Sequence, residues 1–194
     1  MILTMRSDGE ATRARILDAA AHEFAEHGLA GARVDRIAAS ASASKERLYA
    51  YFGDKRSLFV AVLTDHMRDI TESMPISADD LPGFVGGIFD FAHSNPEHFR
   101  MMQWAKLSGD LDLLPEVPAS VMERDARVIG EAQQRGLADP AWSPRELFGL
   151  LFALATSEVF FPLSEASPAD AVSKRAAVVR AAAKLIAVPE TDVR

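Results

Sequence analysis

Residues 33–56 read RVDRIAASASASKERLYAYFGDKR, and we expect the rest of the chain to be built around this stretch. Its apolar residues recur at helical spacing over residues 34–41, and a second short helical pattern runs from residue 45 to about residue 51. A serine-rich interruption, residues 42–44, separates the two patterns. Two short helices joined by a few turn residues are the sequence form of a helix-turn-helix.

Charge supports a nucleic-acid partner for this stretch. Residues 33–56 carry six Lys and Arg against three Asp and Glu, in a chain whose net charge is −7. Residues 1–56 hold nine basic and eight acidic residues, whereas residues 57–194 hold 12 and 20. Phosphate contacts dominate DNA affinity, so an acidic chain normally argues against DNA binding, but here the acid is segregated. Charge alone also fits a solvated basic face; the helix pattern is what favours DNA.

The second short helix of such a motif lies in the major groove, with its N-terminal residues nearest the base edges. Arg47 can donate two hydrogen bonds to guanine O6 and N7. Lys45, Ala50 and Tyr51 are the other base-edge candidates, with Ala50 suited to a thymine methyl group. Glu46 either accepts from a cytosine amino group or weakens binding by its charge.

The pattern from Thr12 to about Phe59 resembles the N-terminal DNA-binding region of TetR-type (tetracycline-repressor-like) transcriptional regulators. A match spread over almost fifty residues is far more specific than a lone short motif, and it covers about the first third of the chain. The matching residues are Ile16-Leu17, Phe24, His27-Gly28, Val34, Ile37-Ala38, Ser44-Lys45, Leu48-Tyr49, Phe52 and Lys55.

The resemblance implies a ligand-responsive regulator of the repressor type that binds a palindromic operator in double-stranded DNA. It also implies phosphate contacts at Tyr49 and Lys55, to which Arg33 and Arg36 are added as further candidates. Lys55 follows Asp54, a good helix N-cap, and a cation there opposes the helix dipole unless an anion docks nearby. The plain alternative is a solvated lysine.

Three residues depart from the family's pattern. Ser42 stands where the turn usually has Gly, and a non-Gly residue with positive φ costs roughly 1 kcal/mol, so we expect a strained or shifted turn. Glu46 stands where a small residue is usual, and its effect on DNA binding is left open. Arg33 replaces the Ser or Thr that often caps the first reading helix, so we expect this cap to be lost.

Helical signals continue to the end of the chain, and no strand-like alternation occurs. Ser7 to Glu10 has the form of a capping box, and Gly28 is the expected end of the helix that follows. We therefore expect an all-α fold of about nine helices. An N-terminal three-helix helix-turn-helix DNA-binding domain would span residues 1–56, and a C-terminal helical domain for effector binding and dimerisation would span residues 57–194.

The last two helices are expected to form a homodimer. The helix opened by Ser143-Pro144 is apolar nearly all round, and the helix opened by Ser167-Pro168 carries small apolar residues at spacings of three and four. Internal packing is the alternative, but the resemblance favours a two-fold dimer, which would read half-sites about 34–36 Å apart or more. The spaced residues are Ala169, Val172, Ala176, Val179, Ala183 and Ile186.

The middle helices are candidates for an apolar effector pocket. Ordinary core packing explains the same residues and is the better interpretation from sequence alone, whereas the resemblance favours a small-molecule effector, because family members commonly hold one there. No effector is identified by the sequence. The candidates are His66, Met67, Phe84, Phe91, Gln103, Trp104, Phe152 and Thr156.

Other classes of function find little support. The chain has no cysteine, which excludes disulfides and thiolate chemistry, and its five histidines lack metal-ligand or catalytic spacing. We expect no enzyme activity, metal or cofactor. Because the longest apolar run, Leu147–Ala155, is too short to span a bilayer and no signal peptide is recognisable, we expect a cytoplasmic protein without a membrane partner. A ligand-binding or enzymatic protein with a vestigial helix-turn-helix, or a DNA-binding protein without an effector, remain alternatives.

Overall fold

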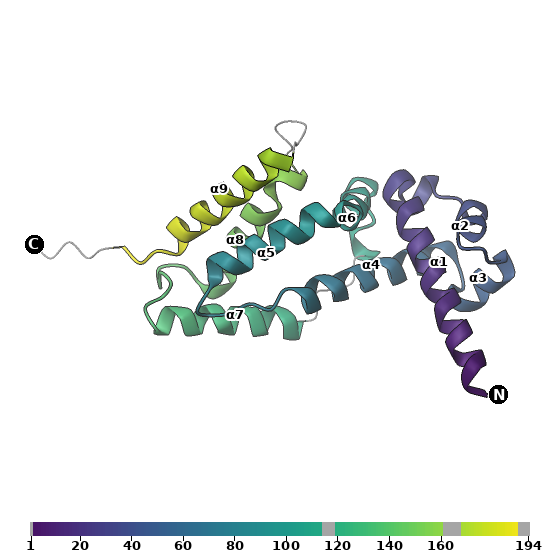
Figure 1. Cartoon of the computed structure of the whole chain (residues 1–194), viewed down its shortest axis with the longest axis horizontal. Helices are drawn as coiled ribbons and strands as arrows, with labels where there is room; N and C mark the ends of the chain where they lie inside the picture. The colour runs from purple at the N-terminus through teal and green to yellow at the C-terminus, as the bar shows by residue number, and fades with distance from the viewer. Residues whose placement is uncertain (1, 114–118, 161–167, 190–194) are drawn as a thin grey trace, which may run out of the picture. The chain divides into compact units, whose positions relative to one another are not determined.

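A computed structural model of the chain describes residues 2–113, 119–160 and 168–189 (Figure 1). Within these residues every regular element is helical, which confirms the expected all-α fold with nine α-helices and one short 3-10 helix. The elements are α1 (Ile2–Gly31), α2 (Val34–Ser40), α3 (Lys45–Phe52), α4 (Lys55–Ser73), α5 (Leu81–Ser94), α6 (Pro96–Ser108), η1 (Leu111–Leu113), α7 (Ala119–Gln134), α8 (Pro144–Phe160) and α9 (Pro168–Ile186). No helix of the described part is long and apolar enough to cross a membrane.

The chain packs into two compact units. The first contains residues 1–69 and 96–115, and the second contains residues 70–95 and 116–194. This division of the packing does not follow the expected boundary at residue 56, because most of α4 and all of α6 join the first three helices. The division of function at residue 56 stays a prediction.

The core of the first unit is built on the apolar stripe of α1. Ile16, Ala20 and Phe24 recur every four residues along the helix and are fully buried, as the sequence predicts. The ring of Phe24 meets that of Phe59 from α4 edge to face, with centroids 5.0 Å apart. Burying side chains of this size contributes about 1.5–3 kcal/mol each, so this core, which also contains Ile37 and Leu48, holds α2 and α3 firmly to α1.

The ends of α1 test two sequence predictions. The helix begins at Ile2, so Ser7 lies within it and the predicted N-cap at Ser7 is wrong. Gly28 has φ 63° and ψ 177°, which interrupts the helix where the sequence predicts its end. One further turn follows the interruption before the chain enters α2.

Other helix starts follow the expected chemistry. The Asp54 carboxylate accepts the Ser57 N–H at 2.7 Å at the start of α4. Ser143 and Glu146 cap one another at the start of α8, each accepting the other's backbone N–H. Pro96 is the first residue of α6, where its missing N–H costs no helical bond. Ser167, expected to cap α9, lies outside the described residues.

The second unit is a layer of α5 packed on α8 and α9, with α7 against α8. Its core is built mainly from apolar side chains, which include Phe84, Val85, Ile88, Ile129, Ala132, Leu147, Leu151, Ala155, Ala182 and Ile186. Arg175 of α9 binds Asp90 of α5 at 2.8 Å, and its guanidinium would lie only 2.7 Å from a Cβ placed on Gly86. Glycine at residue 86 thus leaves room for the Arg175 guanidinium against α5.

Candidate nucleic-acid interface

The turn between α2 and α3 is a Schellman motif. The Ala43 N–H donates to Ala38 O at 2.9 Å and the Ser42 N–H donates to Ala39 O at 3.1 Å. This motif requires a left-handed residue at Ser42, which has φ 51° and is the only non-glycine residue with positive φ in the described ranges. The expected strained turn is therefore present, and the motif explains why glycine would be favoured there.

The reading helix α3 is amphipathic over its eight residues. Ser44 caps it by accepting the Arg47 N–H at 3.2 Å, and Leu48 and Phe52 are buried one turn apart. Burial of these two side chains turns the opposite face outward, and the side chains of Arg47, Tyr49 and Ala50 are exposed on it. Arg47 has no side-chain hydrogen bond or ion pair within the part of the chain that the structure describes.

Helix α1 holds α2 and α3 in place through hydrogen bonds that could not be predicted from the sequence. Arg15 donates to Ala41 O at 3.3 Å, at the C-terminal end of α2. The Tyr51 hydroxyl of α3 donates to Gly9 O at 3.0 Å. Tyr51 is thus a tie to α1, although its ring remains 38% exposed.

Glu23 of α1 caps the start of α2 from outside. It accepts the Arg33 N–H at 2.8 Å and the Arg36 Nε–H at 2.9 Å. As expected, Arg33 provides no side-chain cap of its own, and the missing cap is the one sequence signal that could have suggested an external acceptor. Burial by itself would raise the pKa of Glu23, but the hydrogen bonds and charge of Arg36 and the Arg33 N–H outweigh it and lower the pKa.

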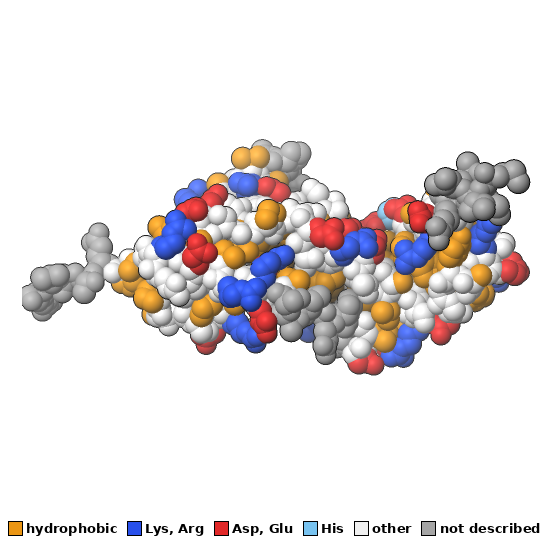
Figure 2. Space-filling view, turned by 90° about the horizontal axis from the view of Figure 1, so that it is seen from below, with side chains coloured by type: hydrophobic (Ala, Val, Ile, Leu, Met, Phe, Trp, Pro, Cys, Tyr) orange, Lys and Arg blue, Asp and Glu red, His pale blue; other side chains and the backbone are white. Residues whose placement is uncertain are grey.

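Two of the predicted DNA-binding cations have acidic partners within the part of the chain that the structure describes. Arg36 is paired with Glu23, and Lys45 is paired with Asp35 in the first turn of α2. Such close pairing recurs elsewhere, since blue and red side chains lie next to one another on the face shown in Figure 2. In contrast, the Arg47 side chain of α3 is exposed towards solvent.

Lys55 and Glu46 both bind helix ends. The Lys55 ammonium donates to Ala30 O at 3.3 Å and Ala32 O at 3.1 Å, where α1 ends and cations are favoured. Hydrogen bonds from its own backbone N–H and from the Ser44 hydroxyl lower the pKa of Glu46, whose carboxylate therefore sits at the positive end of α3. Both side chains stabilise the motif in this structure.

The predicted ligand-binding residues divide between the two units. In the first, the His66 ring stacks on His98 with centroids 3.5 Å apart, and the Trp104 indole N–H donates to Ala25 O of α1. Met67 and Gln103 belong to the same unit. In the second, Thr156 is buried and its hydroxyl donates to the carbonyl of Phe152. The predicted residues thus belong to two units, and a shared ligand site stays a prediction.

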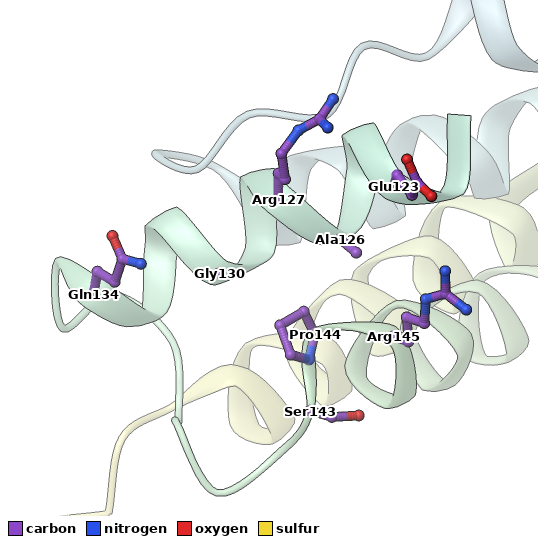
Figure 3. A pocket seen from close by; sticks show the side chains of 8 residues that line it. All are labelled: Glu123, Ala126, Arg127, Gly130, Gln134, Ser143, Pro144 and Arg145. Atoms are coloured by element: carbon purple, nitrogen blue, oxygen red, sulfur yellow. The ribbon is translucent and has the colours of Figure 1, made fainter. Parts of the chain in front are cut away.

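Phe84 and Phe91 do share a pocket. It has a volume of about 340 Å³ and lies along the linker before α5, with Met74 and Pro75 completing its apolar lining and Asp80 adding a carboxylate. A second, more open groove of about 600 Å³ separates α7 from the start of α8 (Figure 3). Its lining contains none of the predicted residues: Glu123, Ala126, Arg127, Gly130, Gln134, Ser143, Pro144 and Arg145.

A capped reading helix, held by α1 with its arginine exposed, defines a helix-turn-helix DNA-binding regulator. Residues 16–62 match the family model of "Bacterial regulatory proteins, tetR family". Residues 80–186 match the family model of "Tetracyclin repressor-like, C-terminal domain". The chain belongs to the tetR family of transcriptional regulators. It is 40% identical over 158 residues to the HTH-type transcriptional repressor SCO4008 of Streptomyces coelicolor, covering 80% of this chain and 82% of that protein.

Solved structures agree with this assignment. The crystal structure of the transcriptional regulator SCO4942 from Streptomyces coelicolor superposes with a TM-score of 0.79 at 34% identity, covering 92% of this chain and 99% of that one. A tetR-family regulator from Mesorhizobium loti, at 19% identity, has the same fold with a TM-score of 0.69, covering 93% and 98% of the two chains. The resemblance seen over the first third of the chain therefore extends to nearly all of it.

Proposed function

We propose that this regulator is a repressor that binds a palindromic operator as a homodimer and leaves it when a small apolar effector binds. The observation that carries the proposal is the exposed face of α3, where Arg47, Tyr49 and Ala50 stand on a capped helix tied to α1. The direction of regulation follows the relative of 40% identity, which is named a repressor. The alternative of a vestigial helix-turn-helix is disfavoured, since this helix retains its cap and its core contacts.

In the proposed complex, Arg47 and Ala50 face base edges and Tyr49 holds a phosphate. Arg36 is a secondary phosphate ligand, and so is Lys45, in place of the base-edge role expected from sequence, because each must leave an acidic partner before it can bind DNA. Lys55 has two of its three N–H groups on α1 carbonyls and keeps one for a phosphate. Arg33 is exposed and acts at the edge of the interface.

The proposed dimer uses α8 and α9. Exposed apolar side chains lie on both helices, with Leu150 39%, Phe160 36% and Val172 72% exposed. The small residues Ala176 and Ala183 are also exposed along α9, where they would let a second copy approach closely. A two-fold pair of these faces would make a four-helix bundle and present two reading helices to a palindrome.

The proposed effector site is the pocket beside Phe84 and Phe91. An apolar lining with a few polar groups, here Ser77 and Asp80, is typical of small-molecule sites. Gly87 also lines it, and a Cβ on Gly87 would meet no atom within 4 Å, so Gly87→Leu should fill the pocket without disturbing α5. Gly130→Leu, which projects into the groove of Figure 3, is the control for an effector that binds elsewhere.

The decisive experiment measures binding of the purified protein to DNA from upstream of its own gene, at two salt concentrations and with unrelated DNA as competitor. We expect competitor-resistant binding that Arg47→Ala weakens by about 1–3 kcal/mol, with relaxed preference at one base position. Arg145→Ala, an exposed arginine at the start of α8, should bind as the parent does. If Arg47→Ala also binds like the parent, the proposed reading face is wrong; if random-sequence selection yields no preferred DNA, the regulator proposal itself fails.

A further inference from the structure

The interruption of α1 at Gly28 is covered by one aromatic side chain. Helical dihedral angles at Gly28 would bring the next N–H to Ala25 O, and their absence deprives that carbonyl of its usual donor. The Trp104 indole of α6 takes that place, donating to Ala25 O at 3.1 Å. Its ring lies directly on Gly28, since a Cβ there would be 2.9 Å from two ring carbons. Trp104 thus fits the break both by hydrogen bonding and by shape.

The break at Gly28 divides the contacts that α1 makes with the helix-turn-helix and with α4. Three hydrogen-bonding contacts between α1 and the reading motif, at Gly9, Arg15 and Glu23, precede Gly28 in the sequence. A fourth, in which Arg36 donates to Gly31 O at 3.4 Å, follows Gly28. The contact with the first residue of α4 follows it, because Lys55 holds the carbonyls of Ala30 and Ala32. Because Phe59 of α4 also packs on Phe24 before the break, and α2 is joined to α1 after it, the angle at Gly28 affects how α2 and α3 sit on α1.

Helix α6 is well placed to control this angle. It packs along α1, with Met101 and Ala105 buried in the same core, and Glu97 at its start binds His22 of α1 at 2.8 Å. The chain also enters the first unit at Pro96, directly after α5 of the second unit. A change in α5 thus has a covalent route to α6, and Trp104 is where α6 meets the break.

We propose that Trp104 is a positioning residue for operator recognition, which acts by locking the break in α1 at Gly28. The inference rests on the proposed DNA binding and adds a residue that touches no DNA. Because base contacts require an accurately placed α3 whereas non-specific phosphate contacts do not, loss of Trp104 should reduce operator affinity selectively. We expect a loss of about tenfold, the lower end of what one good base contact contributes.

The test compares Trp104→Ala and Trp104→Phe with Trp142→Phe, which alters the chain's other tryptophan in the second unit. Affinity for the operator and for unrelated DNA is measured for each at the same salt, after thermal unfolding has confirmed the folded state. Trp104→Phe keeps an aromatic ring and loses only the donor to Ala25 O, so it serves if Trp104→Ala does not fold. The proposal predicts weaker operator binding with unchanged non-specific binding for the Trp104 variants, and parental behaviour for Trp142→Phe.

A pair of glycine variants tests the same contact from the other side. Gly28 and Gly136 both have positive φ, but a Cβ at Gly136 meets nothing within 4 Å, so Gly136→Ala places an alanine at positive φ without a ring clash. Gly28→Ala should lose operator affinity selectively, and less so in a Trp104→Ala background, because the two residues share one contact. If the parent binds the operator and the folded Trp104 variants bind it equally well, the positioning role of Trp104 is wrong but the proposed function stands. If the parent does not bind an operator, the proposed function itself is wrong.

Discussion

At the scale of the residue, Ser42 carries a strain that one substitution should relieve. Its left-handed conformation is imposed by the Schellman motif and has φ 51°. Ser42→Gly should raise the free energy of unfolding by about 0.5–1 kcal/mol, because glycine adopts positive φ without a steric cost. Urea unfolding measures the change. Ser40→Gly, in the helical last turn of α2, should instead lower stability, and a loss of stability in Ser42→Gly would contradict the strain.

Asp35 should limit DNA affinity through its ion pair with Lys45. Both side chains are exposed, so the pair contributes little to stability but holds a cation beside the reading helix. Asp35→Asn should strengthen binding to all DNA sequences and steepen the dependence of affinity on salt by up to about one phosphate contact.

Glu72→Gln is the control for the Asp35 prediction. It removes the same charge from an exposed position of α4. Binding is measured by titration at several salt concentrations with operator and unrelated DNA. An equal gain for the two variants would show that only net charge matters, and an unchanged salt slope for Asp35→Asn would show that Lys45 never reaches a phosphate.

At the scale of the element, the sequence predicted most helices because their signals are local. Apolar periodicity and the caps at Asp54 and Ser143 depend on neighbouring residues, and the structure confirms them. The start of α1 was missed, because a capping-box pattern at Ser7 does not stop a helix that can continue through it. The partners of Glu23 and Lys55 could not be predicted, since they lie ten or more residues away in sequence.

The surface of α3 was predictable to the same degree. The order of exposed and buried residues follows from the amphipathic pattern of the helix, so the exposure of Arg47, Tyr49 and Ala50 could be predicted, whereas their contacts with DNA stay a prediction. Trp104 was assigned to a ligand pocket because an aromatic residue in a middle helix fits either role. Only the packing of α6 on α1, across a large sequence separation, shows that its N–H serves Ala25.

The pairing of α8 with α9 leads to a prediction about assembly. Val172 is 72% exposed in the single chain, so Val172→Glu should leave the subunit folded. Two copies facing across a two-fold axis would place like charges together, which should weaken the dimer at least about tenfold, or 1.4 kcal/mol. Light scattering over a concentration series measures the dissociation.

Leu107→Glu is the matched control for assembly. Leu107 is 82% exposed, lies in α6 of the first unit and is no part of the proposed interface. Its substitution should leave the oligomeric state unchanged. A dimer that tolerates Val172→Glu would place the interface elsewhere and remove α9 from it.

At the scale of the whole molecule, stability should fall in mild acid because of the stacked histidines of α4 and α6. Burial, followed by the charge of His98, lowers the pKa of His66 from 6.5 to about 4, although Asp65 acts in the opposite direction. Burial likewise lowers the pKa of His98 against the influence of Asp69, Glu97 and Asp65. The folded chain therefore disfavours protonation of the His66 and His98 side chains.

The sign of the pH effect follows from where protons bind. Between pH 6.5 and about 4, the unfolded chain protonates its histidines while the folded chain keeps His66 neutral, so stability is complete above this range and declines as the pH falls through it. A fully shielded shift of this size corresponds to about 3 kcal/mol, and partial exposure to water reduces it to about 1–2 kcal/mol. The unfolding temperature should fall by about 2–4 °C for each kcal/mol lost.

His66→Asn should reduce this loss of stability in acid, whereas His22→Asn, at an exposed position on α1, should leave the loss unchanged. If the parent and His66→Asn lose stability in parallel from pH 6.5 to 4, the acid sensitivity lies in other groups.

At lower pH, protonation of Glu23 should reduce the free energy of unfolding further. Because the pKa of Glu23 is lowered in the folded state, its contribution to stability is lost as the pH falls through that lowered pKa.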